Sequence, residues 1–215
     1  MRRACARLTI LDFTEFTLSQ LPPAPQRVLE VGCGHEGGVA PALAAAGYDV
    51  VAIDPEAPAG PLYRRVALED FEDPGPFGAV VAGRVLHHVR PLEPALGKLA
   101  GLAPLLVVDE FAWNHMDEPS ADWYEGRHRL LVAAGREPKG PPDLAEWHRR
   151  HADLHPYETL RAALDARYEE QYFEWGPFFY RWLDGPASEA LEATLIDAGA
   201  IRPIGFRYVG RPRRR

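Results

Sequence analysis

Short, mostly apolar runs recur through the first half of the chain, with helical stretches between them. We predict strands at five of these runs: 28–31, 49–53, 63–68, 77–83 and 105–108. Helices are predicted at 39–46 and 94–102. The run at 105–108 is apolar throughout, as in a parallel strand that is covered on both faces. The alternation of strands and helices predicts an α/β fold.

The second half departs from this alternation. The segment from Phe111 to Asp165 is predicted to be an insertion made mainly of helices. Asp143 and Glu146 have capping-box spacing for one of these helices. The remaining elements are predicted as an amphipathic helix at 12–20, helices at 123–134, 144–154 and up to about 166, a strand at 167–175, a helix at 187–198 and a last strand at 204–209.

A glycine-rich turn follows the first predicted strand. Gly32, Gly34 and Gly37 have the spacing G-x-G-x-x-G, which lets the backbone pass close beneath a ligand. Asp54 ends the second predicted strand, 20 residues after Gly34. A carboxylate at that place can accept two hydrogen bonds from a ribose diol. The sequence therefore predicts a βαβ unit that binds a nucleoside.

Glu30 distinguishes between the possible nucleoside ligands. It lies two residues before Gly32, at the mouth of the turn. A carboxylate there repels a pyrophosphate but suits a ligand that carries an ammonium group. S-adenosylmethionine has both an adenosine ribose and a methionine ammonium group, so the two acids together favour it over a dinucleotide.

The run Leu29-Glu30-Val31-Gly32-Cys33-Gly34 resembles the first motif of class I S-adenosylmethionine-dependent methyltransferases, and 47–54 resembles their second motif. The resemblance has specific motifs over 27–110 and follows the order of elements over 167–210. It implies a Rossmann-like, mostly parallel sheet of seven strands with an antiparallel last strand. Helices would cover both faces, and a helical insertion would follow the fifth strand.

The resemblance also implies which residues bind the cofactor. Glu69 or Asp70 would accept a hydrogen bond from the adenine amino group, although these acids also fit a solvated turn. Carbonyl groups near Gly83 and Arg84 would face the methionine part. The residues implied in cofactor binding are Glu30, Gly32, Cys33, Gly34, Asp54, Pro55, Glu69, Asp70, Phe71, Gly83 and Arg84.

The segment from Phe77 to Val89 resembles the family's "F-D-x-V … L-H-H" segment, with Gly78 in place of the usual aspartate. The family also usually has Gly-Gly before the fifth strand, where this chain has Pro104 nearby. In the family the histidine pair, here His87 and His88, is usually part of the scaffold, and we favour that interpretation over a catalytic base.

The insertion and the N-terminal helix are expected to determine the substrate. Their aromatic content suits a small, partly flat organic acceptor, although the same rings also fit a packed core. The predicted substrate-binding residues are Phe16, His115, Tyr124 and Trp147. We expect the insertion and residues 8–21 to cover the pocket together.

Three histidines follow one another closely in the insertion: His148, His151 and His155. The first two share a helix face, while Pro156 makes the direction of His155 uncertain. They suit a metal site, a general base near the acceptor, or a structural role between helices. We predict His151 and His155 as the catalytic residues and no metal.

Length and composition limit the remaining possibilities. The chain has 215 residues, enough for one well-buried α/β domain. We expect one domain over 1–215, with a cover helix at 8–21, a cofactor core at 27–110, the insertion at 111–165 and the last strands at 166–210. The net charge of −7 disfavours a general nucleic-acid surface, and the basic tail at 211–215 is expected to be a solvated end.

No run approaches the ~20 apolar residues that a bilayer crossing needs. Cys5 and Cys33 are not placed for a disulfide and are too few for a zinc site of thiolates, so we expect a protein of the reducing cytoplasm. The abundance of Ala, Arg, Gly and Pro suggests a bacterial source.

These observations predict an enzyme that transfers a methyl group from S-adenosylmethionine to an oxygen or nitrogen of a small organic molecule. We expect no nucleic-acid or membrane partner and make no prediction about the oligomeric state. One alternative is an NAD-dependent oxidoreductase, which would need the second half of a dinucleotide fold. The other is a non-catalytic S-adenosylmethionine-binding regulatory protein, against which a substrate cavity closed by the insertion would argue.

Overall fold

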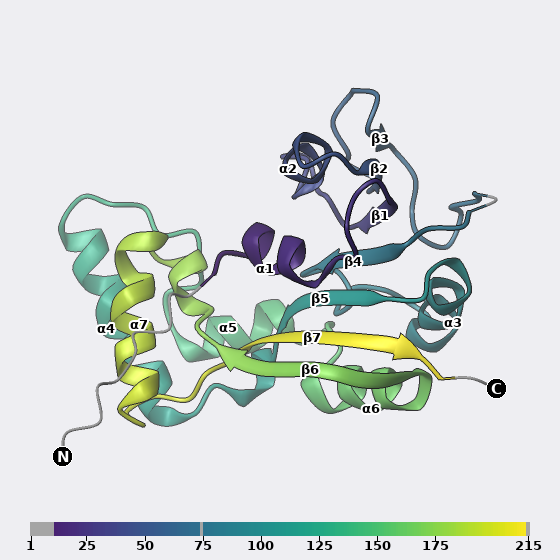
Figure 1. Cartoon of the computed structure of the whole chain (residues 1–215). Coiled ribbons are helices and arrows are strands. Elements are labelled where there is room, and N and C mark those ends of the chain that lie inside the picture. The colour runs from purple at the N-terminus through teal and green to yellow at the C-terminus, as the bar shows by residue number, and fades with distance from the viewer. Residues whose placement is uncertain (1–10, 74, 214–215) are drawn as a thin grey trace, which may run out of the picture.

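A twisted sheet of seven strands forms the centre of the structure (Figure 1). The computed structural model describes residues 11–73 and 75–213. The strands have the order β3-β2-β1-β4-β5-β7-β6. They are β1 (Arg27–Val31), β2 (Asp49–Ile53), β3 (Tyr63–Arg64), β4 (Ala79–Gly83), β5 (Leu106–Phe111), β6 (Tyr168–Gly176) and β7 (Gly205–Pro212).

Strand directions confirm the predicted sheet. The pairs β1–β2, β1–β4, β2–β3 and β4–β5 are parallel, whereas β7 is antiparallel to both β5 and β6. All six residues of β5 are buried, as expected for a central strand with both faces covered. The carboxyl ends of the parallel strands meet at one edge, and β7 begins at the same edge. This carboxyl edge carries the candidate site.

Helices cover both faces of the sheet. One face packs against α1 (Phe13–Gln20) and α2 (Ala40–Ala45), and the other packs against α3 (Leu92–Leu102) and α6 (Tyr157–Arg167). Asp12 caps α1 in a capping box with Glu15, which fixes the start of the helix one residue after the predicted start. The two apolar layers position the strand ends rigidly.

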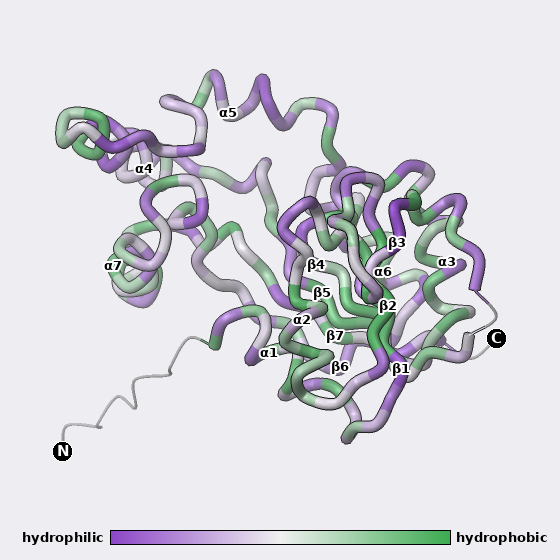
Figure 2. Tube along the Cα trace, turned by 90° about the horizontal axis from the view of Figure 1, so that it is seen from above, coloured by the Kyte–Doolittle hydropathy of each residue, from purple (hydrophilic) through white to green (hydrophobic). Residues whose placement is uncertain are grey.

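The remaining helices lie beyond the carboxyl edge, to one side of the sheet (Figures 1 and 2). They are η1 (Trp113–His115), α4 (Glu118–Ala133), α5 (Leu144–His151), η2 (Phe179–Trp182) and α7 (Pro186–Asp197), and we refer to them as the helical group. They surround a separate apolar cluster built on rings such as Phe111, Tyr124, Trp147 and Phe179. The helical group therefore combines the insertion with the connection between β6 and β7.

Several predicted boundaries were wrong, for physical reasons. The strand expected at 63–68 ends at Arg64, because its partner β2 ends at Ile53 and leaves later residues unpaired. The helix expected at 123–134 begins earlier, at Glu118, because Asp117 accepts from the backbone N–H of Ser120. Asp143 caps α5 as predicted, but the Glu146 carboxylate bonds Arg150 rather than completing the box.

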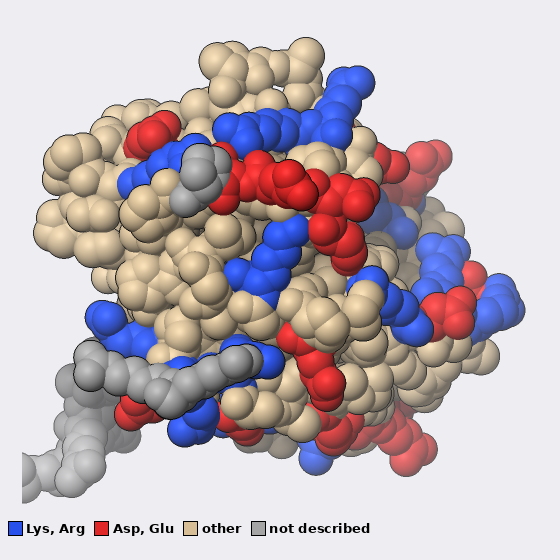
Figure 3. All heavy atoms as spheres, turned by 90° about the vertical axis from the view of Figure 1, so that its right-hand side faces the viewer, with Lys and Arg blue, Asp and Glu red and all other residues tan. Residues whose placement is uncertain are grey.

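Ion pairs of Asp73 join the amino end of β1 to the end of β3. Asp73 pairs with Arg27 at 2.6 Å and with Arg64 at 3.0 Å. The hydrogen bond from Arg27 lowers the pKa of Asp73 to about 2. Figure 3 shows this side of the molecule, where acidic and basic side chains are interspersed. None of the described helices combines the length and apolar character that a membrane crossing requires.

Candidate cofactor and acceptor site

The glycine loop, residues 32–38, lies tightly between β2 and the exit of β4. Gly32 donates its N–H to the carbonyl of Ile53 at 2.9 Å, with φ of +81°. A Cβ atom at this position would lie 2.4 Å from Cβ of Val85. The loop therefore needs glycine both for its backbone angle and for its packing.

Glu30 turns its side chain beneath this loop. One carboxylate oxygen, Oε1, accepts from the N–H of Val39 at 2.8 Å, and a Cβ atom on Gly38 would lie 1.9 Å from it. The other oxygen, Oε2, is buried and has no hydrogen-bond partner among the described residues. Burial raises the pKa of Glu30 to about 7. An orphaned buried acceptor is a place where a ligand donor gains most.

Asp54 anchors the loop from the end of β2. Its Oδ2 accepts from the N–H of Gly34 at 3.0 Å, and its Oδ1 accepts from the N–H of Glu56 at 2.8 Å. Each carboxylate oxygen has two lone pairs, so each retains one for a ribose hydroxyl. The predicted position of the acid, close to the glycines, is confirmed.

The two predicted neighbours of these acids differ in exposure. Cys33 is buried, and burial raises the pKa of its thiol to about 12, so the side chain is a neutral packing group. Pro55 is exposed beside Asp54. Cys5, the other cysteine of the sequence, lies outside the described residues.

Gly83 ends β4 beneath α1, and Arg84 follows it. A Cβ atom on Gly83 would lie 2.8 Å from the ring of Phe13, so α1 packs directly on the strand end. Arg84 has a φ of +54°, which is unusual for a residue with a side chain. Its N–H donates to the carbonyl of Asp109 at 2.7 Å.

The acids implied for the adenine lie in a turn that is tied to α3. Glu69 and Asp70 are exposed, and the carbonyls of Leu68 and Glu69 accept from Nζ of Lys98 at 2.9 Å each. The ring of Phe71 is buried, and the backbone N–H of Phe71 donates to the carbonyl of Leu68 at 3.3 Å. The structure brings Glu30, Asp54 and Gly34 together, while this turn makes its hydrogen bonds to α3.

His87 is a buried partner of Glu110. Nδ1 of His87 lies 2.6 Å from Oε2 of Glu110, and Oε1 of Glu110 accepts from the N–H of Leu86 at 2.7 Å. His88 is exposed, with its ring centroid 4.2 Å from that of His87. The bonds of His87 fix the chain after β4, which agrees with the scaffold interpretation.

His151 and His155 both bond to backbone carbonyls. Nδ1 of His151 lies 2.7 Å from the carbonyl of Trp147, within a buried set of rings. Nε2 of His155 lies 2.9 Å from the carbonyl of Val89. The described residues contain no group of three or more His, Cys, Asp or Glu side chains arranged to hold a metal ion.

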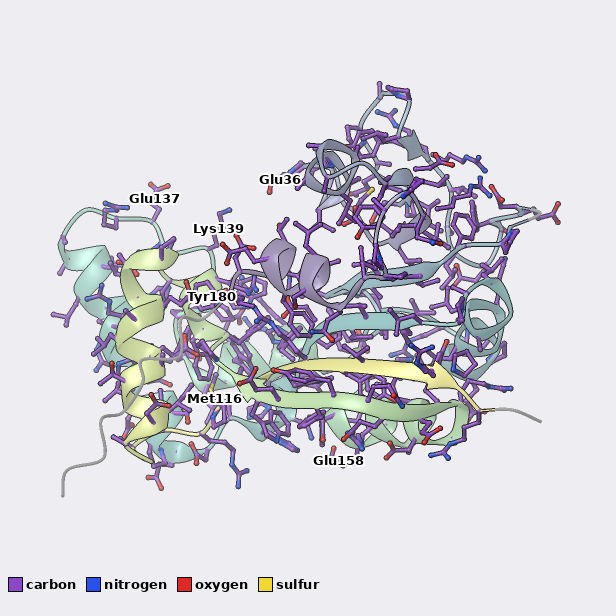
Figure 4. The ribbon with its side chains drawn as sticks, viewed as in Figure 1. Glu36, Met116, Glu137, Lys139, Glu158 and Tyr180 are labelled. Atoms are coloured by element: carbon purple, nitrogen blue, oxygen red, sulfur yellow. The ribbon has the colours of Figure 1, made fainter. Side chains whose placement is uncertain are left out.

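The four predicted substrate-binding residues lie in three places. Tyr124 and Trp147 are fully buried in the helical group, and they donate to the carbonyls of Pro141 and Trp113. Phe16 is on the buried face of α1 and contacts the ring of Tyr172 of β6. His115 bonds Glu158 at 2.6 Å, and Figure 4 shows Glu158 on the side of the sheet away from Glu36 of the glycine loop.

Sequence reasoning did not identify a charged cluster beside Arg84. Asp109 of β5 is surrounded by Arg84, Arg181 of η2 and Arg207 of β7, and we call these three side chains the arginine cluster. The only sequence signal was an acid at the end of a buried strand. The partners of Asp109 are distant in the sequence, and Arg207 lies 98 residues after it.

The glycine loop fits a ligand with an ammonium group and a ribose. The family described as "Methyltransferase domain" matches residues 1–179. The chain belongs to this methyltransferase family. It is an S-adenosylmethionine-dependent methyltransferase, as predicted, and the oxidoreductase alternative was wrong. Glu30, the glycine loop and Asp54 are the residues of this methyltransferase that would hold the cofactor.

Solved structures show the same fold at low sequence identity. An S-adenosylmethionine-dependent methyltransferase from Mesorhizobium loti is 16% identical, with a TM-score of 0.56 and coverage of 92% of this chain and 97% of that chain. A putative methyltransferase from an antibiotic biosynthesis pathway of Anabaena variabilis is 15% identical, with a TM-score of 0.57 and coverage of 92% and 95%.

Magnesium protoporphyrin IX methyltransferase from Synechocystis, solved with bound S-adenosylhomocysteine, is 17% identical, with a TM-score of 0.53. The similarity covers 94% of this chain and 80% of that chain. No curated protein sequence matches the methyltransferase described here. At these identities the structural similarity shows the fold, and the acceptor has to be inferred from the chain's own residues.

Proposed function

We propose that this methyltransferase transfers a methyl group to an oxygen or nitrogen of a small organic molecule. The observation that supports its cofactor site most directly is the buried Oε2 atom of Glu30, which lacks a partner among the described residues. It faces a loop that Asp54 fixes through Gly34. When bound, S-adenosylmethionine supplies a methyl group on a sulfonium, already activated for displacement.

The protein's own residues then have to orient the two reactants and exclude water. Glu30 would bind the ammonium group, and Asp54 would bind the ribose. The side of α1 that carries Phe13 packs on Gly83, so this helix lies over the strand end where the methionine part is expected. The helical group lies beyond the same edge and would form the acceptor side (Figure 2).

If the acceptor is a hydroxyl, a base has to remove its proton. We propose His151 for this role over His155. A carbonyl only accepts, so the contact with Trp147 places the proton of His151 on Nδ1 and leaves Nε2 as an acceptor. Burial lowers the pKa of His151, which keeps the ring neutral. Nε2 of His155 donates to the carbonyl of Val89, so this nitrogen is not free to accept a proton from a substrate.

Calorimetry with S-adenosylhomocysteine and with NAD tests the cofactor site. We expect micromolar binding of S-adenosylhomocysteine and no measurable binding of NAD. Tight NAD binding without binding of S-adenosylhomocysteine would contradict the proposal. A screen of small hydroxyl and amine compounds with labelled S-adenosylmethionine would then identify the acceptor, and stoichiometric label on nucleic acid or protein alone would count against a small molecule.

His151→Ala and His155→Ala form a matched pair for the base. We expect His151→Ala to lower kcat at least about tenfold, to keep S-adenosylhomocysteine affinity, and to remove a limb of the pH–rate profile. His155→Ala should keep that limb. Equal activity and pH profiles in both variants would leave a structural role for both histidines.

A further inference from the structure

The arginine cluster lies at the carboxyl edge, outside the residues assigned to the cofactor. Nη1 of Arg84 and Nη2 of Arg181 lie 3.3 Å and 3.2 Å from Oδ2 of Asp109. Nε of Arg207 lies 3.8 Å from Oδ1. Three guanidinium groups therefore share one carboxylate, which is 7% exposed.

The cluster adjoins both the glycine loop and the cover helix. Arg84 directly follows Gly83, and it is close enough to Glu30 to oppose the rise of that residue's pKa. Arg207 donates to the carbonyl of Leu11 at 2.6 Å and stacks on the ring of Phe16 at 4.8 Å. Arg181 lies in η2, at the border of the helical group. The cluster thus lies where cofactor, cover helix and helical group meet.

Among the described residues, no acid other than Asp109 forms an ion pair with the three guanidinium groups. Glu110 follows Asp109 on the other face of β5, where His87 and backbone N–H groups engage its carboxylate. Glu30 bonds the start of α2 and faces the cofactor side. Glu174, paired with Arg207 across the strands, accepts from the hydroxyl of Tyr172. Asp109 alone bonds all three guanidinium groups.

The guanidinium groups also have unused donors. Nε of Arg181 is buried and has no partner among the described residues, although that side chain is 24% exposed overall. The side chains of Arg84 and Arg207 are 40% and 16% exposed. Buried guanidinium donors without partners are unfavourable, and planar bidentate acceptors satisfy them best.

Aromatic rings border the cluster. The Arg181 guanidinium lies 5.0 Å from the ring centroid of Tyr180 and 5.9 Å from that of Phe178, and Arg207 stacks on Phe16. Figure 4 shows Tyr180 at the side of the helical group that faces α1. A ligand bound here would meet charged donors next to flat apolar surfaces.

We propose that Arg181 and Arg207, together with Arg84, bind the carboxylate of the methyl acceptor, which is a small aromatic acid. The inference rests on the proposed function, because it places the acceptor beside the cofactor site. The cofactor also carries a carboxylate, and Arg84 is the cluster member beside the glycine loop. The test therefore changes Arg181 and Arg207 and measures the cofactor separately.

The probes are 4-hydroxybenzoate and its neutral counterpart 4-hydroxybenzamide, titrated in saturating S-adenosylhomocysteine and followed by ligand-observed NMR. We expect the acid to bind at least about tenfold more tightly than the amide to the unchanged protein. Arg181→Gln and Arg207→Gln should each weaken binding of the acid at least about tenfold and abolish the preference. Arg202→Gln, an exposed arginine outside the cluster, is the matched control and should change neither.

Asp109→Asn provides a variant with the opposite expected direction. It removes the internal carboxylate and should strengthen binding of the acid several-fold. Equal affinity of acid and amide, or unchanged affinity in Arg181→Gln and Arg207→Gln, would overturn the proposal. A loss of S-adenosylhomocysteine affinity in these variants with unchanged acid binding would assign the cluster to the cofactor instead. Failure of the unchanged protein to bind S-adenosylhomocysteine would count against the proposed function itself.

Discussion

In the glycine-loop half, at 27–110, two carboxylates hold backbone N–H groups and keep further acceptor capacity. Oε2 of Glu30 is unpartnered among the described residues, and Asp54 retains lone pairs. In the helical group, the polar atoms of Tyr124 and Trp147 bond to carbonyls of the same group. The comparison teaches that the carboxylates of the expected cofactor site keep free acceptor capacity, whereas the polar atoms of the packed rings are hydrogen-bonded within the core.

The largest expected effect tests the helical side of this comparison. Trp147 is fully buried and donates to the carbonyl of Trp113, so Trp147→Ala should lower the free energy of unfolding by about 3–5 kcal/mol. Urea denaturation measures this. Trp123→Ala, which truncates a less buried ring of the same cluster, should cost less. Unchanged stability together with weakened acceptor binding would instead make Trp147 a pocket residue.

The next effect concerns Asp54. Asp54→Ala removes the acceptor for Gly34 and for the expected ribose, and hydrogen bonds to charged groups contribute roughly 1.5–3 kcal/mol. We expect S-adenosylhomocysteine affinity to fall about ten- to hundredfold by calorimetry. Asp49→Ala, at the exposed start of the same strand, is the control. An equal loss in both variants would show that the strand, rather than the carboxylate at its end, was disturbed.

We expect Glu30 to make the cofactor affinity depend on pH. Burial raises its pKa to about 7, and only the ionised carboxylate attracts the ammonium group. The affinity for S-adenosylhomocysteine should therefore fall as the pH decreases below about 7, by up to about tenfold per pH unit. Glu30→Gln should bind weakly at every pH and show a flat profile. A pH dependence that persists in Glu30→Gln would assign the titration to another group.

The smallest effect is in the stability of the helical group. Glu192 is buried and accepts from the N–H groups of Phe178, Phe179 and Tyr180, and burial raises its pKa to about 7. Between its unfolded pKa and about 7, the Glu192 carboxyl binds more protons in the folded state than in the unfolded state, so its contribution to stability falls as pH rises.

Between about pH 5.5 and 6.5 this contribution is about 1 kcal/mol. Urea denaturation at both values measures it, and Glu192→Gln should remove that part of the slope. Glu30 contributes to the slope with the same sign, whereas His88 and His151 contribute with the opposite sign because burial lowers their pKa. Glu169→Gln, an exposed acid on β6, should leave the slope unchanged. A slope that is the same in Glu192→Gln as in the unchanged protein would contradict the assignment.

Local signals predicted much of the fold. Apolar runs located β1, β2, β4 and β5, and the step from strand to glycine turn to helix located the loop over Glu30. These features depend on neighbours in sequence, since a short buried strand has to be apolar and a tight turn has to contain glycine. Asp54 was also identified from local signals, because it ends the second apolar run and lies 20 residues after Gly34.

Tertiary structure alone decided the roles of the aromatic and basic side chains. Trp147 and Tyr124 resembled pocket residues in sequence but pack inside the helical group, because ring burial depends on which helices meet. Arg84, Arg181 and Arg207 converge on Asp109 only because β7 returns antiparallel to β5 and η2 follows β6. Composition and periodicity describe one element at a time, whereas this charged cluster forms where β5, the segment after β4, η2 and β7 come together in space.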